Sequence, residues 1–505
     1  MADLDHLGQL FMVDFTGMTP AAEVERLIAE EKIGGVTLFD KNVTAPGQVA
    51  ALTNALQTRA AAAGAPPLLI GADQEGGPVV RLRPTHFPSA MAFGAAGSEA
   101  LVASAAAVTA RELRATGIHI DFAPAVDVNN NPANPVIGVR SYGEDPDLVA
   151  RLGVQAVTAM QSAGVIATVK HFPGHGDTTV DSHLSLPTVA HPRSRLEAVE
   201  LKPFRAAIRA GVEAVMTAHV VYPALDPKNP ATLSPAIIGM LRHELGFRGL
   251  VVTDSMRMLA IADRYSPGEA AVQAVLAGAD LILALGPTEV QREAIECVRA
   301  AAASGRIPSS RIAEAAERVL AAKRRLGLFA RAVVDEAAVA REVGTPEHLA
   351  LADRVAQTAA TVVRDRAGML PLPAGAVSVV AGAAPEDTVV RLAAAIRAAG
   401  RDAAVGALEG VAADGRGSIV IPLSEGPGTV DPAMRARGHA IVKSAVGRGP
   451  TVVIATGTPY GLTGVPDGAA SVAVYGSDPA SLRAAAGVLI GSVRPQGRLP
   501  VTVAA

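Results

Sequence analysis

The sequence predicts an α/β protein with an N-terminal (β/α)8 TIM barrel, followed by a smaller C-terminal α/β sandwich domain. A chain of 505 residues is long for a single domain. In residues 1–330 the pattern of a short apolar run, a polar loop and an Ala-rich helical stretch occurs eight times. A second set of strand–helix units begins near residue 350. We therefore expect a barrel domain over 1–330, a linker over 331–349 and an α/β domain over 350–505.

The predicted strands are short apolar runs without polar alternation, as expected for strands that are buried on both faces of a parallel sheet. The barrel strands are FMVDF (11–15), GGVTLF (34–39), LLIGADQE (68–75), IHIDFAPAVDV (118–128), IATVKHF (166–172), AVMTAHV (214–220), LVVTDS (250–255) and LILAL (281–285). Helical stretches that end near a Gly separate them, and residues 311–329 predict a closing amphipathic helix. The second domain has strand candidates at VSVVAGA (377–383), SIVIPLS (418–424), TVVIATG (451–457) and SVAVYGS (471–477).

The composition excludes several classes of partner. A net charge of -3 gives no reason to expect nucleic acid or an anionic membrane surface. The N-terminus lacks the basic start of a secretory signal, and the sequence has no uncharged apolar run of about 18 residues that could span a membrane. We therefore expect a cytoplasmic protein. The single cysteine, Cys297, excludes an intrachain disulfide and reads as a structural thiol. Without Trp, a small polar pocket is favoured over a long polysaccharide groove.

Several predicted strands end in polar or charged residues. In a (β/α)8 barrel the carboxyl ends of the strands form the rim where active sites lie. A polar residue that merely begins a solvent-exposed loop is the alternative at any one position, but the feature recurs along the barrel. The residues are Asp73, Asp127, Lys170, His171, His219 and Asp254.

The loop KHFPGHGDTTVDSH (170–183) concentrates titratable groups. His171 and His175 have a spacing that binds metal when a helix places both on one face, but Pro173 lies between them and prevents that helix. We therefore expect neither a metal nor a cofactor. In extended backbone, residues two apart point to the same side, so Asp181 can orient His183 as a proton donor and acceptor. A surface Asp–His pair without a function remains the alternative.

Three further motifs supply polar groups to the same rim. An ionised Asp254, in GLVVTDSMRM, can act as nucleophile or electrostatic stabiliser. DQEGGPVVRL offers Asp73 and Arg81, and its glycines let the backbone approach a ligand. NPANPVIGVRSYGEDP offers Arg140. A pocket this dense in hydrogen-bonding groups fits a hydroxyl-rich small molecule such as a sugar.

These four motifs, in this order, resemble glycoside hydrolase family 3, in its β-N-acetylglucosaminidase branch. TVVIATGTPYGL and VRPQGRLPVTV resemble that family's C-terminal domain more loosely. The resemblance implies a retaining exo-β-N-acetylglucosaminidase that acts on small GlcNAc conjugates such as cell-wall recycling fragments. It implies that Asp254 is the nucleophile and that His183, supported by Asp181, is the acid/base. It implies substrate-binding roles for Asp73, Arg81, Arg140, Lys170 and His171.

The chain departs from the family pattern in two places. Pro78 follows the double glycine where Arg is frequent, although Arg81 remains available. Glu425, in LSEGPG, is the one candidate for the second-domain acid of the glucosidase branch, and we expect it to have no catalytic role because the D-S-H element is intact. The alternatives are a β-N-acetylglucosaminide phosphorylase, a family 3 β-glucosidase, a metal-dependent hydrolase and a non-catalytic sugar-binding protein. The natural leaving group and the oligomeric state stay open.

Overall fold

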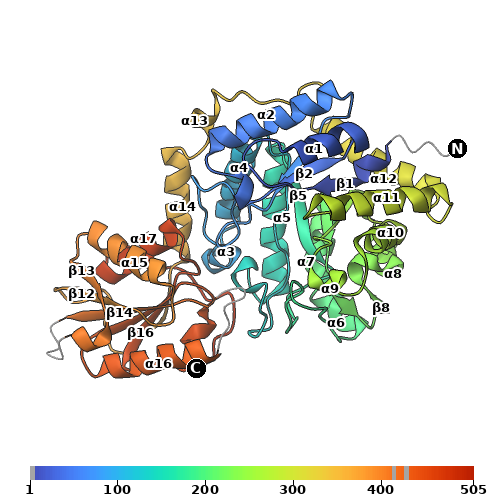
Figure 1. Ribbon diagram of the computed structural model, residues 1–505. Helices are drawn as coiled ribbons and strands as arrows, with labels where there is room; N and C mark the ends of the chain where they lie inside the picture. The colour runs from blue at the N-terminus through green and yellow to red at the C-terminus, as the bar shows by residue number, and fades with distance from the viewer. Residues whose placement is uncertain (1–5, 412–416, 426–431, 505) are drawn as a thin grey trace.

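The computed structural model describes residues 6–411, 417–425 and 432–504, which form two lobes (Figure 1). The larger lobe holds the N-terminal barrel and the smaller lobe holds the C-terminal sheet, with helix α14 (Pro346–Ala359) lying between them. No helix among the described residues is both long enough and apolar enough to cross a bilayer.

Eight parallel strands form the barrel, in the spatial order β10-β1-β2-β3-β4-β5-β6-β9. A parallel bridge between Val252 and Leu281 brings the two ends of this order together. The prediction of a (β/α)8 barrel is therefore confirmed, and all eight predicted runs contain a strand. The strands are β1 (Phe11–Val13), β2 (Gly35–Leu38), β3 (Leu69–Ala72), β4 (Ile120–Asp121), β5 (Ile166–Phe172), β6 (Ala214–Thr217), β9 (Leu250–Thr253) and β10 (Ile282–Leu283).

The barrel interior is filled by apolar side chains, among them Met12, Leu69, Phe122 and Met216, which form one buried cluster. The carboxyl ends of the strands carry the polar residues instead. A small hairpin of β7 (Val221–Tyr222) and β8 (Asp226–Pro230) follows β6. The helices around the barrel are α1 (Ala22–Arg26), α2 (Pro46–Ala62), α3 (Ala90–Ala96), α4 (Glu99–Ala115), α5 (Pro146–Ser162), α6 (Arg193–Ala198), α7 (Leu201–Arg209), α8 (Pro235–Gly239), α9 (Leu259–Ala262), α10 (Pro267–Ala277), α11 (Thr288–Ala303) and α12 (Ser309–Arg325).

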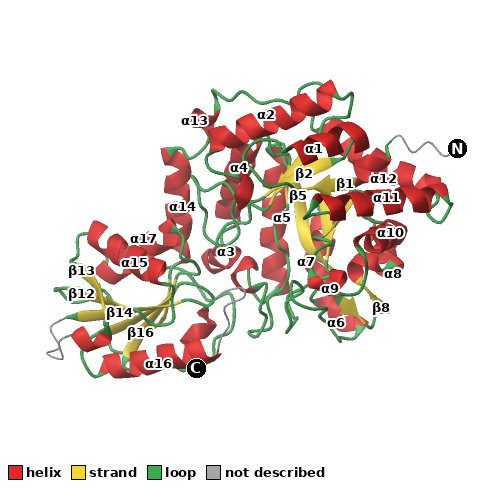
Figure 2. Ribbon diagram, viewed as in Figure 1, coloured by secondary structure: helices red, strands yellow, loops and turns green. Residues whose placement is uncertain are grey.

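The smaller lobe is a six-stranded sheet in the order β11-β16-β15-β14-β12-β13. Every neighbouring pair is parallel except β11 with β16. Helices α15 and α17 lie on one side of the sheet and α16 on the other (Figure 2), which confirms the predicted α/β sandwich. The elements are α13 (Val339–Glu342), β11 (Thr361–Arg364), β12 (Val377–Val380), α15 (Glu386–Ala398), β13 (Ala403–Gly406), β14 (Ser418–Leu423), α16 (Pro432–Val446), β15 (Thr451–Ala455), β16 (Ala469–Ala473) and α17 (Pro479–Ile490).

Two edge strands, β11 and β13, were not predicted. β13 reads AAVG, a composition as compatible with the end of a helix as with a strand, and Val405 in it is exposed. Only the four central strands have the continuous apolar runs that signal burial on both faces.

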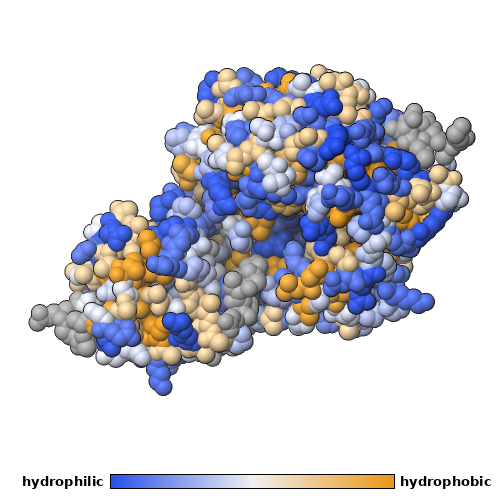
Figure 3. Space-filling model, viewed as in Figure 1, coloured by the Kyte–Doolittle hydropathy of each residue, from blue (hydrophilic) through white to orange (hydrophobic). Residues whose placement is uncertain are grey.

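Direct hydrogen bonds join the two lobes beside the barrel rim. The Asn129 side-chain amide donates to the Tyr460 hydroxyl at 3.0 Å, and the Ser89 hydroxyl donates to the Tyr475 carbonyl at 2.7 Å. Asn129 lies two residues after Asp127, so the second lobe supports a loop that belongs to the polar rim. In the space-filling view, a hollow with hydrophilic residues opens in the larger lobe next to the smaller one (Figure 3).

Candidate active site

A cavity of about 480 Å3 opens at the carboxyl ends of the barrel strands. It brings together all the predicted site residues except Asp181, which lies behind His183. Strands β2, β3, β4, β5, β6, β9 and β10, or the residues directly after them, all contribute to its lining. The lining includes Phe39, Asp73, Glu75, Arg81, Arg140, Lys170, His171, His175, Ser182, His183, Met216, Asp254, Ser255, Arg257 and Met258.

One wall of this cavity is a buried ion-pair cluster that we call the strand wall: Asp73, Glu75, Arg140 and Lys170. Lys170 Nζ lies 2.8 Å from Asp73 Oδ1 and 2.6 Å from Glu75 Oε1. Arg140 grips the Glu75 carboxylate with two hydrogen bonds of 2.8 Å. Burial by itself raises the pKa of Glu75, but Arg140 and Lys170 outweigh it and hold that pKa well below its usual range. Glu75 is therefore ionised at neutral pH, and its ion pairs fix the wall in position.

Arg81 extends this wall toward the mouth. Its Nη2 lies 3.6 Å from Asp73 Oδ2, and its Nη1 lies 3.5 Å from Asp40 Oδ2. The guanidinium also stands over the Phe39 ring, 5.6 Å from the centroid. Although Pro78 stands where the family frequently has Arg, the guanidinium of Arg81 still lines the cavity.

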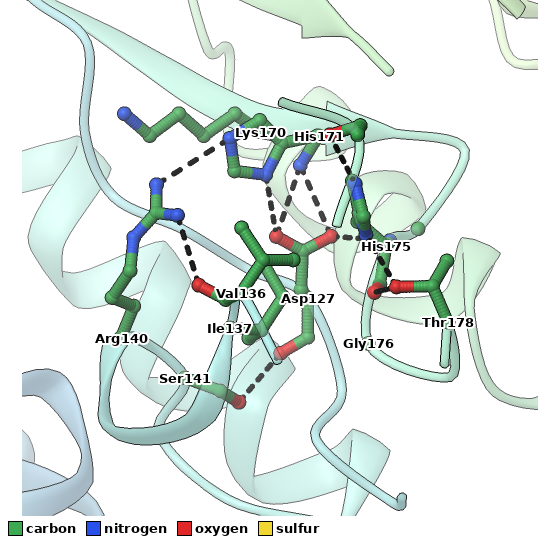
Figure 4. A network of polar contacts seen from close by, with 12 residues as sticks. Asp127, Val136, Ile137, Arg140, Ser141, Lys170, His171, His175, Gly176 and Thr178 are labelled. Atoms are coloured by element: carbon green, nitrogen blue, oxygen red, sulfur yellow. Dashed lines mark hydrogen bonds and ion pairs between the residues drawn. The ribbon is translucent and has the colours of Figure 1, made fainter. Parts of the chain in front are cut away.

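Asp127, in the loop after β4, is the centre of a second hydrogen-bond network (Figure 4). Its carboxylate accepts the His171 ring Nδ1–H at 2.8 Å and the backbone N–H of His175 at 2.6 Å. Burial raises the pKa of Asp127, but His171 outweighs this and the pKa is lowered. The Arg140 guanidinium, which only donates, lies 3.5 Å from Nε2 of His171. The His171 ring is therefore held in one orientation, with Nδ1 toward Asp127 and Nε2 toward Arg140.

Asp254 follows the last residue of β9, so the barrel core fixes where its carboxylate points. Its Oδ1 accepts the backbone N–H of Ser255 at 2.7 Å. Burial raises the pKa of Asp254, but the neighbouring His171 and His219 rings and the Ser255 hydrogen bond outweigh it, and the pKa is lowered. An ionised carboxylate that lines a cavity can act as a nucleophile.

Asp181 and His183 lie in contact, as the sequence predicts, but the backbone between them is a turn and not an extended strand. Asp181 Oδ1 accepts both the backbone N–H of His183 at 2.8 Å and its ring Nδ1–H at 2.7 Å. The Asp181 carbonyl accepts the N–H of Leu184 at 2.9 Å, which closes the turn. The expectation of extended backbone was wrong because an Asp side chain readily bonds the N–H two residues ahead. No described residue bonds Nε2 of His183, and the side chain is 58 % exposed.

His175 attaches this turn to the barrel. The residue is buried; its Nδ1 lies 2.8 Å from Thr178 Oγ1 and its Nε2 lies 2.9 Å from Ser182 Oγ. Burial lowers the pKa of His175 to about 4, so the ring is neutral at pH 7. Ser182 therefore does face away from the Asp181–His183 pair, and its hydroxyl is held by His175.

Three features of the cavity and its support were not predicted from the sequence: Glu75, the orienting role of Asp127, and Arg257. Glu75 is two positions after Asp73 in DQEGG, and that spacing could have placed both on one side. Asp127 is noticeable only as a polar strand-end residue, because its partners His171 and His175 come from β5 and the loop after it.

Among the described residues, Asp177, His191 and Glu200 place potential metal-ligand atoms within 4.8 Å of one another. This group does not line the cavity. Asp177 Oδ2 lies 2.5 Å from His191 Nε2, and Glu200 receives Arg195 Nη1 at 2.8 Å and 2.9 Å. These side chains therefore already satisfy one another as ion pairs.

Glu425, the acid from the second lobe, is held by another residue. Arg435 donates Nε–H to Oε1 at 2.6 Å and Nη2–H to Oε2 at 2.7 Å. Glu425 is not among the residues that line the cavity. Its carboxylate serves this ion pair within the smaller lobe.

The sequence of residues 4–322 matches the family model described as glycosyl hydrolase family 3 N terminal domain. The chain belongs to glycosyl hydrolase family 3. It is 36 % identical to beta-hexosaminidase A of Pseudoalteromonas piscicida over 411 residues, which are 72 % of this chain and 68 % of that protein. It is 40 % identical to a beta-hexosaminidase of Alkalilimnicola ehrlichii over 286 residues, which are 55 % of this chain and 80 % of that one.

Solved structures of this glycosyl hydrolase family match both lobes. A family 3 beta-N-acetylglucosaminidase from Paenibacillus sp. str. FPU-7 superposes with a TM-score of 0.90 at 39 % identity, covering 100 % of this chain and 99 % of that one. The beta-glucoside phosphorylase BglX superposes with a TM-score of 0.87 at 23 % identity, covering 99 % of this chain and 94 % of that one, which shows a shared fold alone. The resemblance read from the four motifs is confirmed.

Proposed function

We propose that this family 3 enzyme is a retaining exo-β-N-acetylglucosaminidase that removes terminal, non-reducing β-linked GlcNAc. One observation supports it above the others: an Asp254 carboxylate with a lowered pKa and an Asp-backed imidazole, His183, line the same cavity. A nucleophile and a separate proton donor are what a double displacement at a sugar carbon needs. The matched beta-hexosaminidases support the choice of sugar.

In the proposed mechanism, Asp254 attacks the anomeric carbon while Nε2 of His183 gives its proton to the departing oxygen. The products of this step are a glycosyl ester on Asp254 and the protonated leaving group. His183 then takes a proton from water, and the resulting hydroxide attacks the anomeric carbon and releases the Asp254 carboxylate. Asp181 holds Nδ1–H throughout, which leaves Nε2 as the nitrogen that exchanges protons.

In this proposal the strand wall recognises the sugar hydroxyls. Lys170 and Arg140 supply donors, and Asp73 supplies an acceptor that is only 20 % exposed. Arg81 and His171, which line the same cavity, bind the sugar as well. Because these groups are held by one another before a sugar arrives, little side-chain order is lost on binding. A cavity at the barrel rim, as opposed to a long groove, fits an enzyme that removes the terminal sugar of its substrate.

For the natural substrate we propose GlcNAc conjugates derived from the cell wall, met in the cytoplasm. The proposal rests on the small polar cavity and the absence of Trp from the chain, which disfavour a long polymer. Release of GlcNAc from purified muropeptide fragments, compared with release from chitin oligomers, tests this choice. Preference for the longer chitin chains would contradict it.

A glycosyl fluoride of GlcNAc carrying a second fluorine on the ring tests the mechanism, because it forms the ester quickly and hydrolyses it slowly. Mass spectrometry of peptides should locate the adduct on Asp254. The variant Asp254→Asn should take up no label. An adduct on any other residue would falsify the assignment.

A β-N-acetylglucosaminide phosphorylase is the second candidate. A neutral or protonated imidazole at His183 carries no negative charge that would repel phosphate, as a carboxylate acid/base would. Turnover in phosphate buffer would then give GlcNAc-1-phosphate, whereas a hydrolase gives free GlcNAc. Nuclear magnetic resonance of the phosphorus distinguishes the two products directly.

A further inference from the structure

Arg257 is an exposed cation at the mouth of the cavity that the proposed mechanism does not use. It lies three residues after Asp254, and it lines the cavity together with His183 and Met258. Its place on the rim is therefore next to the reacting groups, and its charge faces a region that a ligand can enter.

The other basic side chains of the cavity are paired, and Arg257 is not. Lys170 and Arg140 bind Glu75, and Arg81 lies near Asp40 and Asp73. In residues 6–411, 417–425 and 432–504, the guanidinium of Arg257 makes neither a hydrogen bond nor an ion pair; the one bond of this residue is from its backbone N–H to Ser255 Oγ. Arg257 thus offers a full set of donors to a ligand.

Gly286 gives this side chain its place. The glycine follows the β10 segment with a φ of +106°, and a Cβ there would lie 2.2 Å from Arg257 Cδ and 2.6 Å from Nη1. The N–H of Gly286 donates to Asp14 Oδ1 at 2.5 Å, which fixes the glycine itself. The stem of Arg257 therefore rests against a fixed backbone, and its head is positioned although it is exposed.

The backbone around Arg257 lies beside the turn that carries the acid/base pair. The N–H of Leu259 donates to the His183 carbonyl at 3.4 Å, and that of Ala260 donates to the Ser182 carbonyl at 3.3 Å. A proton donor must reach the oxygen of the leaving group, so this turn marks the side from which that group departs. The strand wall comes from β3, β5 and the loop of Arg140. Arg257 therefore lies on the leaving-group side of the cavity and not on the strand wall.

We propose that Arg257 is a specificity residue that binds an oxyanion on the leaving-group side of the cavity. The inference rests on the proposed function and adds the charge of the ligand to it. Two sources share this chemistry: a carboxylate on the departing group, and a phosphate that takes the place of water. Both occupy the same position, because in a double displacement the acceptor enters where the leaving group left.

Two aryl substrates of GlcNAc measure the first source: one with a 4-carboxyphenyl leaving group and one with the uncharged 4-carbamoylphenyl group. The quantity is the ratio of their kcat/KM values, in which general effects on turnover cancel. Arg257→Gln should lower the carboxylate-to-amide ratio about threefold to tenfold, the size expected for an exposed charged hydrogen bond. Arg257→Lys should keep part of the preference, and added salt should weaken it in the wild type.

Arg264→Gln is the matched control. This arginine is exposed, lies on the same segment seven residues further on and does not line the cavity. It should leave both rates and their ratio unchanged. The second source is measured with inorganic phosphate, as the fraction of product that is GlcNAc-1-phosphate, which Arg257→Gln should lower by a similar factor.

Each outcome has one meaning. A change in the substrate ratio alone assigns Arg257 to an acidic leaving group, and a change in the phosphate product alone assigns it to the acceptor. If the folded variant changes neither while the wild type turns over both aryl substrates, the role of Arg257 is overturned and the proposed function stands. If the wild type turns over neither aryl substrate, the proposed function fails, and the role of Arg257 fails with it.

Discussion

The two sides of the cavity are built in opposite ways. The strand wall is buried: Lys170 is 2 % exposed and holds two carboxylates within 2.8 Å. The acid/base turn is open: His183 is 58 % exposed, and within the described part of the chain Asp181 is its one side-chain partner. The barrel strands thus fix the groups proposed to bind the sugar, whereas a surface turn carries the group proposed to move protons.

This difference separates stability from turnover. A buried ion pair that loses one partner leaves a charge without solvent, which destabilises the fold as well as the site. An exposed imidazole that is removed is replaced by water, with little effect on folding. Substitutions on the two sides should therefore move the unfolding free energy and the rate by different proportions.

Asp254→Asn should have the largest effect on rate. The amide cannot form a glycosyl ester, so kcat/KM for an aryl β-GlcNAc should fall by about 10⁴-fold or more. The change in unfolding free energy should be small, because Asn keeps the shape and can still accept the Ser255 N–H. Activity within about tenfold of wild type would contradict a covalent role.

Glu75→Gln should have the largest effect on stability. It leaves Lys170 and Arg140 buried without their shared negative charge, which costs about 3–5 kcal/mol of unfolding free energy. Urea unfolding at pH 7 measures this loss. Glu317→Gln, at an exposed pair with Arg324, is the matched control and should change little.

The difference in unfolding free energy between wild type and Glu75→Gln should depend on pH, in a direction that the pKa of Glu75 sets. The folded pKa of Glu75 is lowered, so its stabilisation is present above the pKa of an unfolded Glu, about 4.3, and is lost as the pH falls below that value. The gap between wild type and Glu75→Gln should therefore narrow between about pH 4 and pH 3. A gap that stays constant over this range would mean that packing, and not charge, accounts for the loss.

His183→Ala should reduce the rate in proportion to the need for an acid. For an alkoxide leaving group the loss should be about 10²–10⁴-fold, and for a good leaving group such as dinitrophenolate it should be much smaller in the first step. The unfolding free energy should hardly move, which is the contrast with Glu75→Gln. Equal losses on good and poor leaving groups would remove His183 from the acid role.

The sequence predicted the barrel and most of the cavity because both depend on local signals. Continuous apolar runs mark the strands, and Asp254 and Lys170 lie at the ends of such runs. Glu75 was missed, and Asp127 was predicted only as a polar strand-end residue, because the roles of both come from partners on other strands, which no local pattern displays. The backbone at Asp181 was predicted to be extended, but it forms a turn. The Asp181 side chain bonds the backbone N–H of His183, and such local bonds compete with extended structure.

The proposed role of Arg257 could not be predicted from the sequence either. Its lack of a partner among the described residues is a property of the folded chain, because only there do Lys170, Arg140 and Arg81 pair with the carboxylates of the strand wall. In the sequence it is one of many arginines. The position of Gly286 beside it adds a contact between segments 29 residues apart in the chain.

The smallest effect should come from Ser182→Ala, which tests whether the open turn has a buried anchor. The change removes the Oγ that meets Nε2 of His175 at 2.9 Å, but leaves Asp181 and His183 themselves in place. We expect a loss of about threefold to tenfold in kcat on poor leaving groups and about 1 kcal/mol of unfolding free energy, the size of one buried hydrogen bond.

Ser185→Ala, at an exposed serine of the same turn, is the matched control. His175 is fixed from the barrel by the bond between its backbone N–H and Asp127. A rate loss confined to Ser182→Ala therefore means that the turn is anchored to the barrel through His175. If both serine variants behave alike, the turn is positioned by its own backbone, and the two sides of the cavity are mechanically independent.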